Sequence, residues 1–140
     1  MAVLAGLLLV SGCASQPQES LFISGSCPSE VDTAVVDVVT SQQQAFAEGD
    51  FTTARSFASA EFQSAVDLDQ FTEIIESQYG YLLKDPELEF TECDLRRGKA
   101  YLTVIVQASP TQTLTYRLVP EGNTWRIDEA IATVSPAVAA

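Results

Sequence analysis

Apolar residues recur at helical spacing over residues 29–49, near the start of the chain. A stripe that returns every three or four residues is typical of an amphipathic helix packed on a core. Ser29 is expected to cap the first turn, with Asp32 in a short capping box. Gly49 should end the helix, because glycine adopts the left-handed conformation at least cost. The apolar face holds Val31, Val35, Val38, Ala45 and Phe46, and the solvent face holds Asp32, Asp37, Gln43 and Glu48.

Three shorter helical patterns follow this first helix. One covers residues 51–58 and begins at the carboxylate of Asp50, which can accept from free amides of the first turn. A second covers residues 60–66. Asp67 is expected to cap the third, over residues 68–79, with Gln70 completing a capping box. Gly80 is its expected stop, and its apolar stripe consists of Leu68, Phe71, Ile74, Ile75 and Tyr79.

The second half of the chain changes to a period of two, which predicts half-buried strands. The four runs cover residues 87–95, 100–108, 113–119 and 124–133. Short connections between them favour an antiparallel meander. The sequence therefore predicts an α+β fold, with N-terminal helices packed in the concave face of a curved four-stranded antiparallel meander.

Turn lengths predict the pairing of these strands. A four-residue loop over 120–123 would pair Leu118 with Trp125 and Tyr116 with Ile127. A three-residue loop over 110–112 would pair Val106 with Tyr116. The first strand changes face midway, since its apolar residues are even-numbered at first and odd-numbered later. A β-bulge near Thr91 or Glu92 would turn both sets inward and curl the sheet.

Composition narrows the range of functions. The chain has 140 residues, enough for one domain, and 46% of them are apolar. There are 19 acidic residues against 7 basic ones and no histidine, which gives a net charge of -12. This charge repels phosphate backbones and anionic lipids, so we expect no nucleic-acid partner and no direct electrostatic binding to membranes. The residues also contain no nucleophile elbow, phosphate loop or metal-ligand cluster, so we expect no catalytic residue, no metal site and no cofactor.

The first residues have the character of a processing signal. Residues 1–18 carry no charged side chain, and a short apolar run precedes Val10-Ser11-Gly12-Cys13. These four residues resemble the lipobox of bacterial lipoproteins. The resemblance implies cleavage before Cys13, diacylglycerol on its sulfur, and a position on the extracytoplasmic face of a membrane in the bacterial cell envelope. A leader of 12 residues is short, so we expect a start codon upstream of Met1. The alternative is an unmodified Cys13, buried or disulfide-bonded.

The lipobox interpretation divides the chain into four parts: a signal peptide over 1–12, a lipid-anchored tether over 13–28, a folded domain over 29–134 and a frayed tail over 135–140. It also leaves two cysteines, Cys27 and Cys93, in an oxidising compartment. A disulfide between them would join the front of the first helix to the sheet. Two unpaired thiols acting as small apolar residues are the alternative.

Two motifs resemble the nuclear transport factor 2-like superfamily, also called SnoaL-like, whose fold is a cystatin-like α+β cone. The first is Ala45-Phe46-Ala47-Glu48-Gly49-Asp50-Phe51, followed by Ala54. The second is the closing Gly122-Asn123-Thr124-Trp125-Arg126-Ile127-Asp128. Within that superfamily the chain is most similar to domain-of-unknown-function members on secreted and lipid-anchored bacterial proteins. The resemblance implies that Trp125 plugs the cone near the last hairpin.

Two functions remain open at this stage. The favoured one is a non-catalytic binding or accessory module that takes a protein or a small apolar ligand, as a monomer or a homodimer. The alternative is a cone enzyme of the isomerase or dehydratase type, in which a carboxylate beside tyrosines acts as a base. An open cavity with an ionisable group at its floor would favour the enzyme. The pocket candidates are Tyr79, Tyr116 and Trp125, with Glu92 and Tyr81 as further inward candidates, whereas Arg126 and Asp128 are expected on the outer face.

Overall fold

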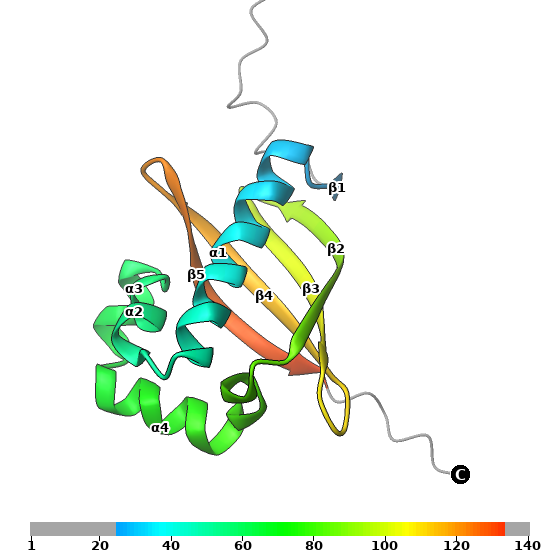
Figure 1. Ribbon diagram of the computed structural model, residues 1–140. Coiled ribbons are helices and arrows are strands. Elements are labelled where there is room, and N and C mark those ends of the chain that lie inside the picture. The colour runs from blue at the N-terminus through cyan, green and yellow to red at the C-terminus, as the bar shows by residue number, and fades with distance from the viewer. Residues whose placement is uncertain (1–24, 134–140) are drawn as a thin grey trace, which may run out of the picture.

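The computed structural model describes residues 25–133 and has the predicted α+β class. The helices come first, and one curved antiparallel sheet with strand order β1-β2-β3-β4-β5 follows (Figure 1). No helix among these residues is long and apolar enough to cross a membrane. The elements are β1 (Gly25–Ser26), α1 (Ser29–Ala47), α2 (Phe51–Ser56), α3 (Ala60–Ala65), α4 (Leu68–Gln78), the 3-10 helix η2 (Gly80–Lys84), β2 (Glu87–Arg96), β3 (Lys99–Gln107), β4 (Gln112–Glu121) and β5 (Thr124–Thr133).

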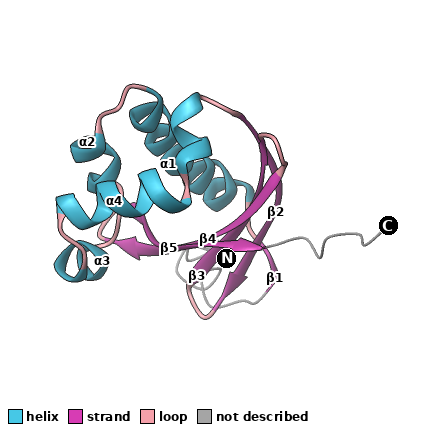
Figure 2. Ribbon diagram, turned by 90° about the horizontal axis from the view of Figure 1, so that it is seen from below, coloured by secondary structure: helices cyan, strands magenta, loops and turns pink. Residues whose placement is uncertain are grey.

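Helix α1 runs across the concave face of the sheet, and the other helices lie beside it on the same face (Figures 1 and 2). Its valines Val35 and Val39 are almost fully buried, as are Val104 and Leu114 on the facing strands. Val39 takes the core position that the sequence pattern assigned to Val38, which is only partly buried. The core is therefore a single layer between α1 and the sheet.

Two details of α1 differ from the prediction. Pro28, not Ser29, is the N-cap residue, and it makes no side-chain capping bond. The amide of Cys27 donates to the Cys93 carbonyl at 2.9 Å, so the chain stays extended up to the helix start. Gln43 is buried rather than solvated, because its side-chain amide donates to the Leu82 carbonyl at 2.8 Å. The predicted end is correct, since Gly49 has a φ of 70°.

Helix α4 begins as predicted. The Asp67 carboxylate accepts from the Gln70 amide at 2.8 Å, and the Gln70 side chain accepts from the Asp67 amide at 3.0 Å, which completes the capping box. Leu68, expected on the apolar stripe, is 37% exposed because it sits in the first turn, beyond the edge of the core. The helix ends where predicted, with Tyr79 as the C-cap directly before Gly80, and Gly80 then opens η2.

The predicted bulge in β2 is present. The register between β2 and β3 shifts between Phe90 and Glu92, which leaves Thr91 without a partner. Phe90 therefore pairs with Val104, and Cys93 pairs with Leu102, all on the core side. The bulge bends the strand, and the sheet curves around α1 (Figure 2).

The predicted strand registers are wrong. Leu118 pairs with Ile127, not with Trp125, because β4 and β5 extend to a two-residue turn in which Gly122 has a φ of 61°. In the other hairpin, Tyr116 lies opposite Leu102 rather than Val106. Both slips next to the turns are by an even number of residues, so the apolar side chains keep their face. A second bulge, at Asp128, lies between the pairs Leu118–Ile127 and Arg117–Glu129.

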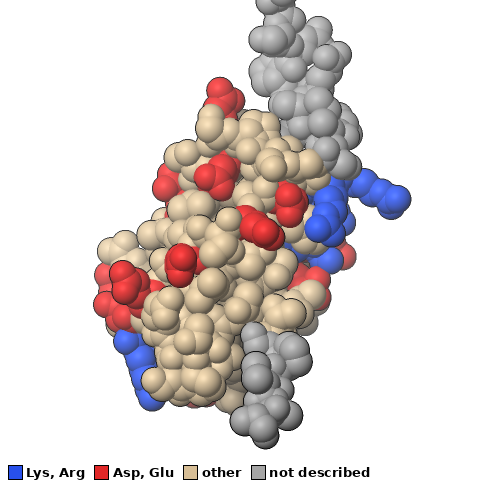
Figure 3. Space-filling view, turned by 90° about the vertical axis from the view of Figure 1, so that its right-hand side faces the viewer, with Lys and Arg blue, Asp and Glu red and all other residues tan. Residues whose placement is uncertain are grey.

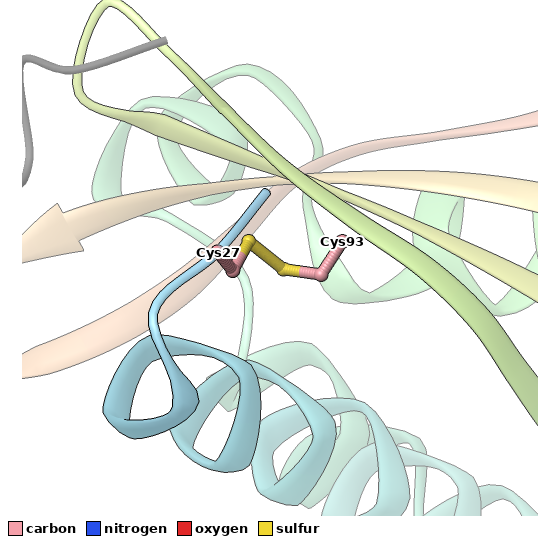
Figure 4. The surroundings of a disulfide bond; sticks show 2 residues. All are labelled: Cys27 and Cys93. Atoms are coloured by element: carbon pink, nitrogen blue, oxygen red, sulfur yellow. A yellow bond between two sulfur atoms is a disulfide. The ribbon is translucent and has the colours of Figure 1, made fainter. Parts of the chain in front are cut away.

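The disulfide between Cys27 and Cys93 is present, with the Cα atoms 5.3 Å apart. It joins the segment before α1 to the middle of β2 (Figure 4). The adjoining residues form the fifth strand that the sequence pattern missed, in which Gly25 and Ser26 pair with Leu95 and Asp94. A strand of two residues leaves no period-two signal in the sequence.

Candidate functional site

A cavity of about 340 Å³ lies on the concave side of the sheet, between the helices and strands β4 and β5. This volume is within the usual range for small-molecule sites. Its wall is mainly apolar, and a short row of polar groups lies along β4 and β5. The lining residues are Gln42, Phe46, Ala58, Phe62, Phe71, Ile74, Ile75, Tyr79, Leu82, Leu114, Tyr116, Arg117, Ile127, Asp128, Glu129 and Ala130.

Packed aromatic rings form the helical wall of the cavity. Phe46 of α1 stacks with Phe71 of α4 at a centroid distance of 6.0 Å. Phe62 of α3 meets the same ring edge-on, also at 6.0 Å. Each helix places one of these rings on its buried face, so the wall depends on the packing of three helices. Such a wall suits contact with an apolar ligand.

Polar and charged side chains meet at the bulge around Asp128, whose residues border the cavity. Ser59 Oγ donates to Asp128 Oδ1 at 2.8 Å, and Arg117 Nη2 donates to Asp128 Oδ2 at 2.8 Å. Arg117 also reaches the carboxylate of Glu129 at 2.9 Å. The Ser59 amide donates to the Ile127 carbonyl at 2.8 Å, and this bond holds the segment between α2 and α3 against β5.

These contacts determine the ionisation of Asp128. Burial alone would raise its pKa, but the hydrogen bonds from Ser59 and Arg117 outweigh burial and hold the pKa below its ordinary value. Asp128 is therefore an ionised group with both oxygens already accepting hydrogen bonds. It is poorly suited to take a proton from a substrate at neutral pH.

Three tyrosines gather at the end of the cavity near η2. Tyr79 donates to the Ala130 carbonyl at 3.3 Å, and its ring centroid is 6.3 Å from that of Tyr81. Burial, together with the nearby Tyr79, raises the pKa of Tyr81 to about 12. Burial also raises the pKa of Tyr116, with Tyr81 and Tyr79 adding to the shift. The hydroxyls of Tyr81 and Tyr116 therefore stay protonated at neutral pH.

Tyr81 has a further peculiarity. Its hydroxyl oxygen is buried and has no hydrogen-bond partner among the residues that the structure describes. A buried hydroxyl without a partner is costly, so it is a place where an added acceptor would be stabilising. Tyr81 itself is not among the lining residues, although its ring is close to that of Tyr79, which does line the cavity.

The sequence-predicted pocket residues are placed as follows. Tyr79 and Tyr116 line the cavity. Trp125 does not line it and lies half-buried opposite Pro120, at the hairpin end of β5. Glu92 is exposed, on the outer side of the sheet opposite Thr103. Cys13, the proposed lipid attachment, lies outside the described residues.

The sequence reasoning missed Arg117, Asp128 and Glu129 as cavity residues. Strict alternation put Asp128 on the outer face, where it meets Arg117, but it did not predict the bulge or the hydrogen bond from Ser59. Nothing in the local sequence marks this bulge. Within residues 25–133, no three His, Cys, Asp or Glu side chains come together as a metal site would require.

Comparison with known proteins gives one match. No curated protein and no solved structure matched the chain. The matching family model is the domain of unknown function DUF4864, which covers residues 29–139 and so includes every element from α1 to β5. This chain therefore belongs to the DUF4864 family.

Proposed function

We propose that this domain is a non-catalytic binding module that holds a small, largely apolar molecule in the cavity between its helices and strands β4 and β5. The single observation that carries the proposal is the cavity of about 340 Å³ with an aromatic wall on one side and the tyrosines Tyr79 and Tyr116 at one end. An apolar body would contact Phe46 and Phe71. A hydrogen-bonding group on the same molecule would be directed toward Tyr116 or the β5 edge.

The polar groups of the cavity favour binding over catalysis. A cone enzyme of the isomerase type needs a carboxylate with a raised pKa that is free to accept a proton. The partly buried carboxylate beside this cavity, Asp128, has a lowered pKa, and both of its oxygens already accept hydrogen bonds. Asp128 instead accepts hydrogen bonds from both Ser59 and Arg117, and these bonds stabilise the sheet side of the cavity.

Binding of a neutral apolar fluorophore, 1-aminoanthracene, tests the proposal. The native chain should bind it with an increase in fluorescence. Ala130→Phe should weaken binding at least tenfold, because Ala130 lines the cavity and a phenyl ring there would fill it. Ala132→Phe is the matched control, since Ala132 is exposed on the same strand and is not a lining residue.

Two results would contradict the proposal. One is a native chain that gives no fluorescence change at millimolar fluorophore. The other is equal weakening by Ala130→Phe and Ala132→Phe, because a general effect on folding would then explain the loss. Thermal unfolding of both variants separates misfolding from loss of the cavity.

We also propose that the module is a lipoprotein, anchored through Cys13 to the extracytoplasmic face of a bacterial membrane. The lipobox-like Val10-Ser11-Gly12-Cys13 supports this, and the Cys27–Cys93 disulfide is consistent with an oxidising compartment. Growth of producing cells with an alkynyl fatty acid should label the chain, and Cys13→Ser should abolish the label. A labelled Cys13→Ser chain would overturn the assignment.

The fold further supports a relationship to the nuclear transport factor 2-like superfamily. The order of four helices followed by a curled antiparallel meander is the order expected for that cone. Such a relationship would concern architecture only, since these cones host unrelated functions.

A further inference from the structure

Cationic side chains are concentrated at one hairpin of this acidic molecule. Three of the seven Lys and Arg residues, Arg96, Arg97 and Lys99, lie at the turn between β2 and β3, and all three are exposed. The ion pairs within residues 25–133 are those of Arg117 with Asp128 and Glu129. None of the three hairpin cations therefore forms an ion pair within this part of the chain.

The backbone of this turn adds a second observation. Arg97 has a φ of 51° and the following Gly98 a φ of 78°, so both central residues of the hairpin are left-handed. Asparagine or glycine is the usual first residue of such a turn, because other side chains are strained there. The exposed Arg97 places a positive charge at the tip of the hairpin although its backbone is strained. Strained backbone of this kind is common at functional positions.

The hairpin lies where the anchored end of the chain enters the domain. Gly25 pairs with Leu95, directly before Arg96, so β1 starts beside the hairpin (Figure 1). Cys13 precedes Gly25 by only 12 residues, which can span at most about 40 Å when fully extended. Figure 3 shows blue side chains gathered at this same end of the molecule. A lipid on Cys13 would keep this end near the membrane.

We propose that the hairpin tip formed by Arg96, Arg97 and Lys99 docks on the anionic phospholipid surface of the membrane that carries the anchor, which orients the domain. This inference rests on the anchor proposed at Cys13. The net charge of -12 repels such a surface as a whole, which is why composition alone predicted no electrostatic binding to membranes, but composition does not show where the few cations lie. The molecule therefore turns its cationic end toward the lipid and its acidic body away.

The shape of the tip suits a lipid phosphate. The three cations line a groove with Gly25 and Tyr101, and Asp94 is the carboxylate that borders it. The Arg96 guanidinium lies over the Tyr101 ring, 5.0 Å from its centroid, which holds that side chain against the sheet. The anchor keeps the domain next to the membrane, so the effective concentration of lipid headgroups at the hairpin is high. Weak attraction of three cations to these headgroups is then enough to select one orientation of the domain.

The test uses the full chain coupled through Cys13 to a maleimide lipid, since the other two cysteines form the disulfide. Trp125, the single tryptophan, is the probe. Ala100 pairs with Leu118 and Leu118 with Ile127, so Trp125 lies at the same end of the sheet as the hairpin. Energy transfer from Trp125 to dansyl-labelled headgroups should be greater on phosphatidylglycerol vesicles than on phosphatidylcholine vesicles.

A matched pair of variants distinguishes the effect of the cations at the hairpin tip from the effect of the net charge of the molecule. Lys99→Gln should lower the ratio of docked to undocked molecules about fivefold, the factor expected for one basic residue near an anionic surface. Lys84→Gln makes the same change in charge at η2, before the opposite end of β2, and should leave energy transfer unchanged. The triple variant Arg96→Gln/Arg97→Gln/Lys99→Gln should give the phosphatidylcholine value on both vesicles.

Equal energy transfer on the two vesicle types would overturn the proposal, as would equal effects of Lys99→Gln and Lys84→Gln. Because the maleimide lipid supplies the anchor chemically, this result is independent of acylation in cells. A chain that docks when coupled but carries no lipid in cells would overturn the anchor and leave the tip as an anionic-lipid site.

Discussion

Asp128 receives hydrogen bonds from two distant parts of the chain, Ser59 and Arg117. We expect Asp128→Asn to lower the free energy of unfolding by about 1–2 kcal/mol, because it weakens charge-assisted hydrogen bonds in a partly buried site. Chemical denaturation in urea measures the change. Glu129→Gln, at the half-exposed partner of the same arginine, should cost less than about 0.5 kcal/mol.

The same carboxylate predicts a pH dependence. Because its pKa is lowered in the folded state, its contribution is fully present above the ordinary value of 3.8 and is lost as the pH falls through the lower folded value. The difference between the native chain and Asp128→Asn should therefore shrink below about pH 4. An equal difference at pH 7 and pH 3 would contradict the assigned ionisation.

For Tyr81 we expect stability to be lost at high pH, in contrast to the loss at low pH for Asp128. Its folded pKa is raised to about 12, so the stability it contributes is present below about pH 10 and is lost as the pH rises toward 12. We expect Tyr81→Phe to leave the free energy of unfolding unchanged or to raise it by up to about 1 kcal/mol at pH 7, because the buried hydroxyl has no partner to lose among the described residues. It should also reduce the loss of stability between pH 10 and pH 12.

Tyr79→Phe is the comparison for that experiment. Its hydroxyl donates to the Ala130 carbonyl at 3.3 Å, so its removal should cost about 0.5–1 kcal/mol at pH 7. If Tyr81→Phe proved the more costly change of the two, the Tyr81 hydroxyl would have a partner that the described residues do not provide.

At the level of elements, the disulfide links the strand before α1 to the bulged strand β2. The two cysteines are 66 residues apart, and closing a loop of this size is worth about 4 kcal/mol in the chain-entropy model. We expect Cys27→Ser/Cys93→Ser to lose most of this free energy of unfolding, measured with guanidinium chloride. Cys13→Ser should leave stability unchanged, because it breaks no bond in the domain. Equal losses in both variants would contradict this account.

The elements also differ in how well the sequence predicted them. The Asp67–Gln70 capping box and the Asp50 cap are formed by residues three apart, so local pattern was sufficient. The Thr91 bulge was predictable because the apolar residues of β2 change parity around it. The registers of β3, β4 and β5 were not, because the turn lengths that determine them depend on how far each strand continues past its last apolar residue.

For the whole molecule, the excess of 19 acidic over 7 basic residues should oppose folding through self-repulsion. We expect the melting temperature to rise when KCl is increased from about 10 mM to 200 mM at pH 7, since salt screens this repulsion. The rise should be smaller near pH 4, where the carboxylates are partly protonated. A melting temperature that falls with KCl at pH 7 would mean that attractive ion pairs dominate.

The sequence by itself determined the α+β class, the helix starts at Asp50 and Asp67 and the inward faces of the strands, and it favoured Cys27 and Cys93 as disulfide partners over two unpaired thiols. Each of these follows from the chemistry and spacing of residues near one another along the chain, apart from the cysteines, which were paired by elimination once Cys13 was assigned to lipid.

Only the tertiary structure decided where the candidate site lies. The cavity takes its walls from three α-helices, η2 and two strands, and beside it a bulge at Asp128 meets Ser59, 69 residues earlier. The burial of Gln43 beneath Leu82 and the gathering of Arg96, Arg97 and Lys99 beside β1 have the same origin. Contacts between residues far apart in the sequence depend on register and packing, and no local pattern of polar and apolar positions records them.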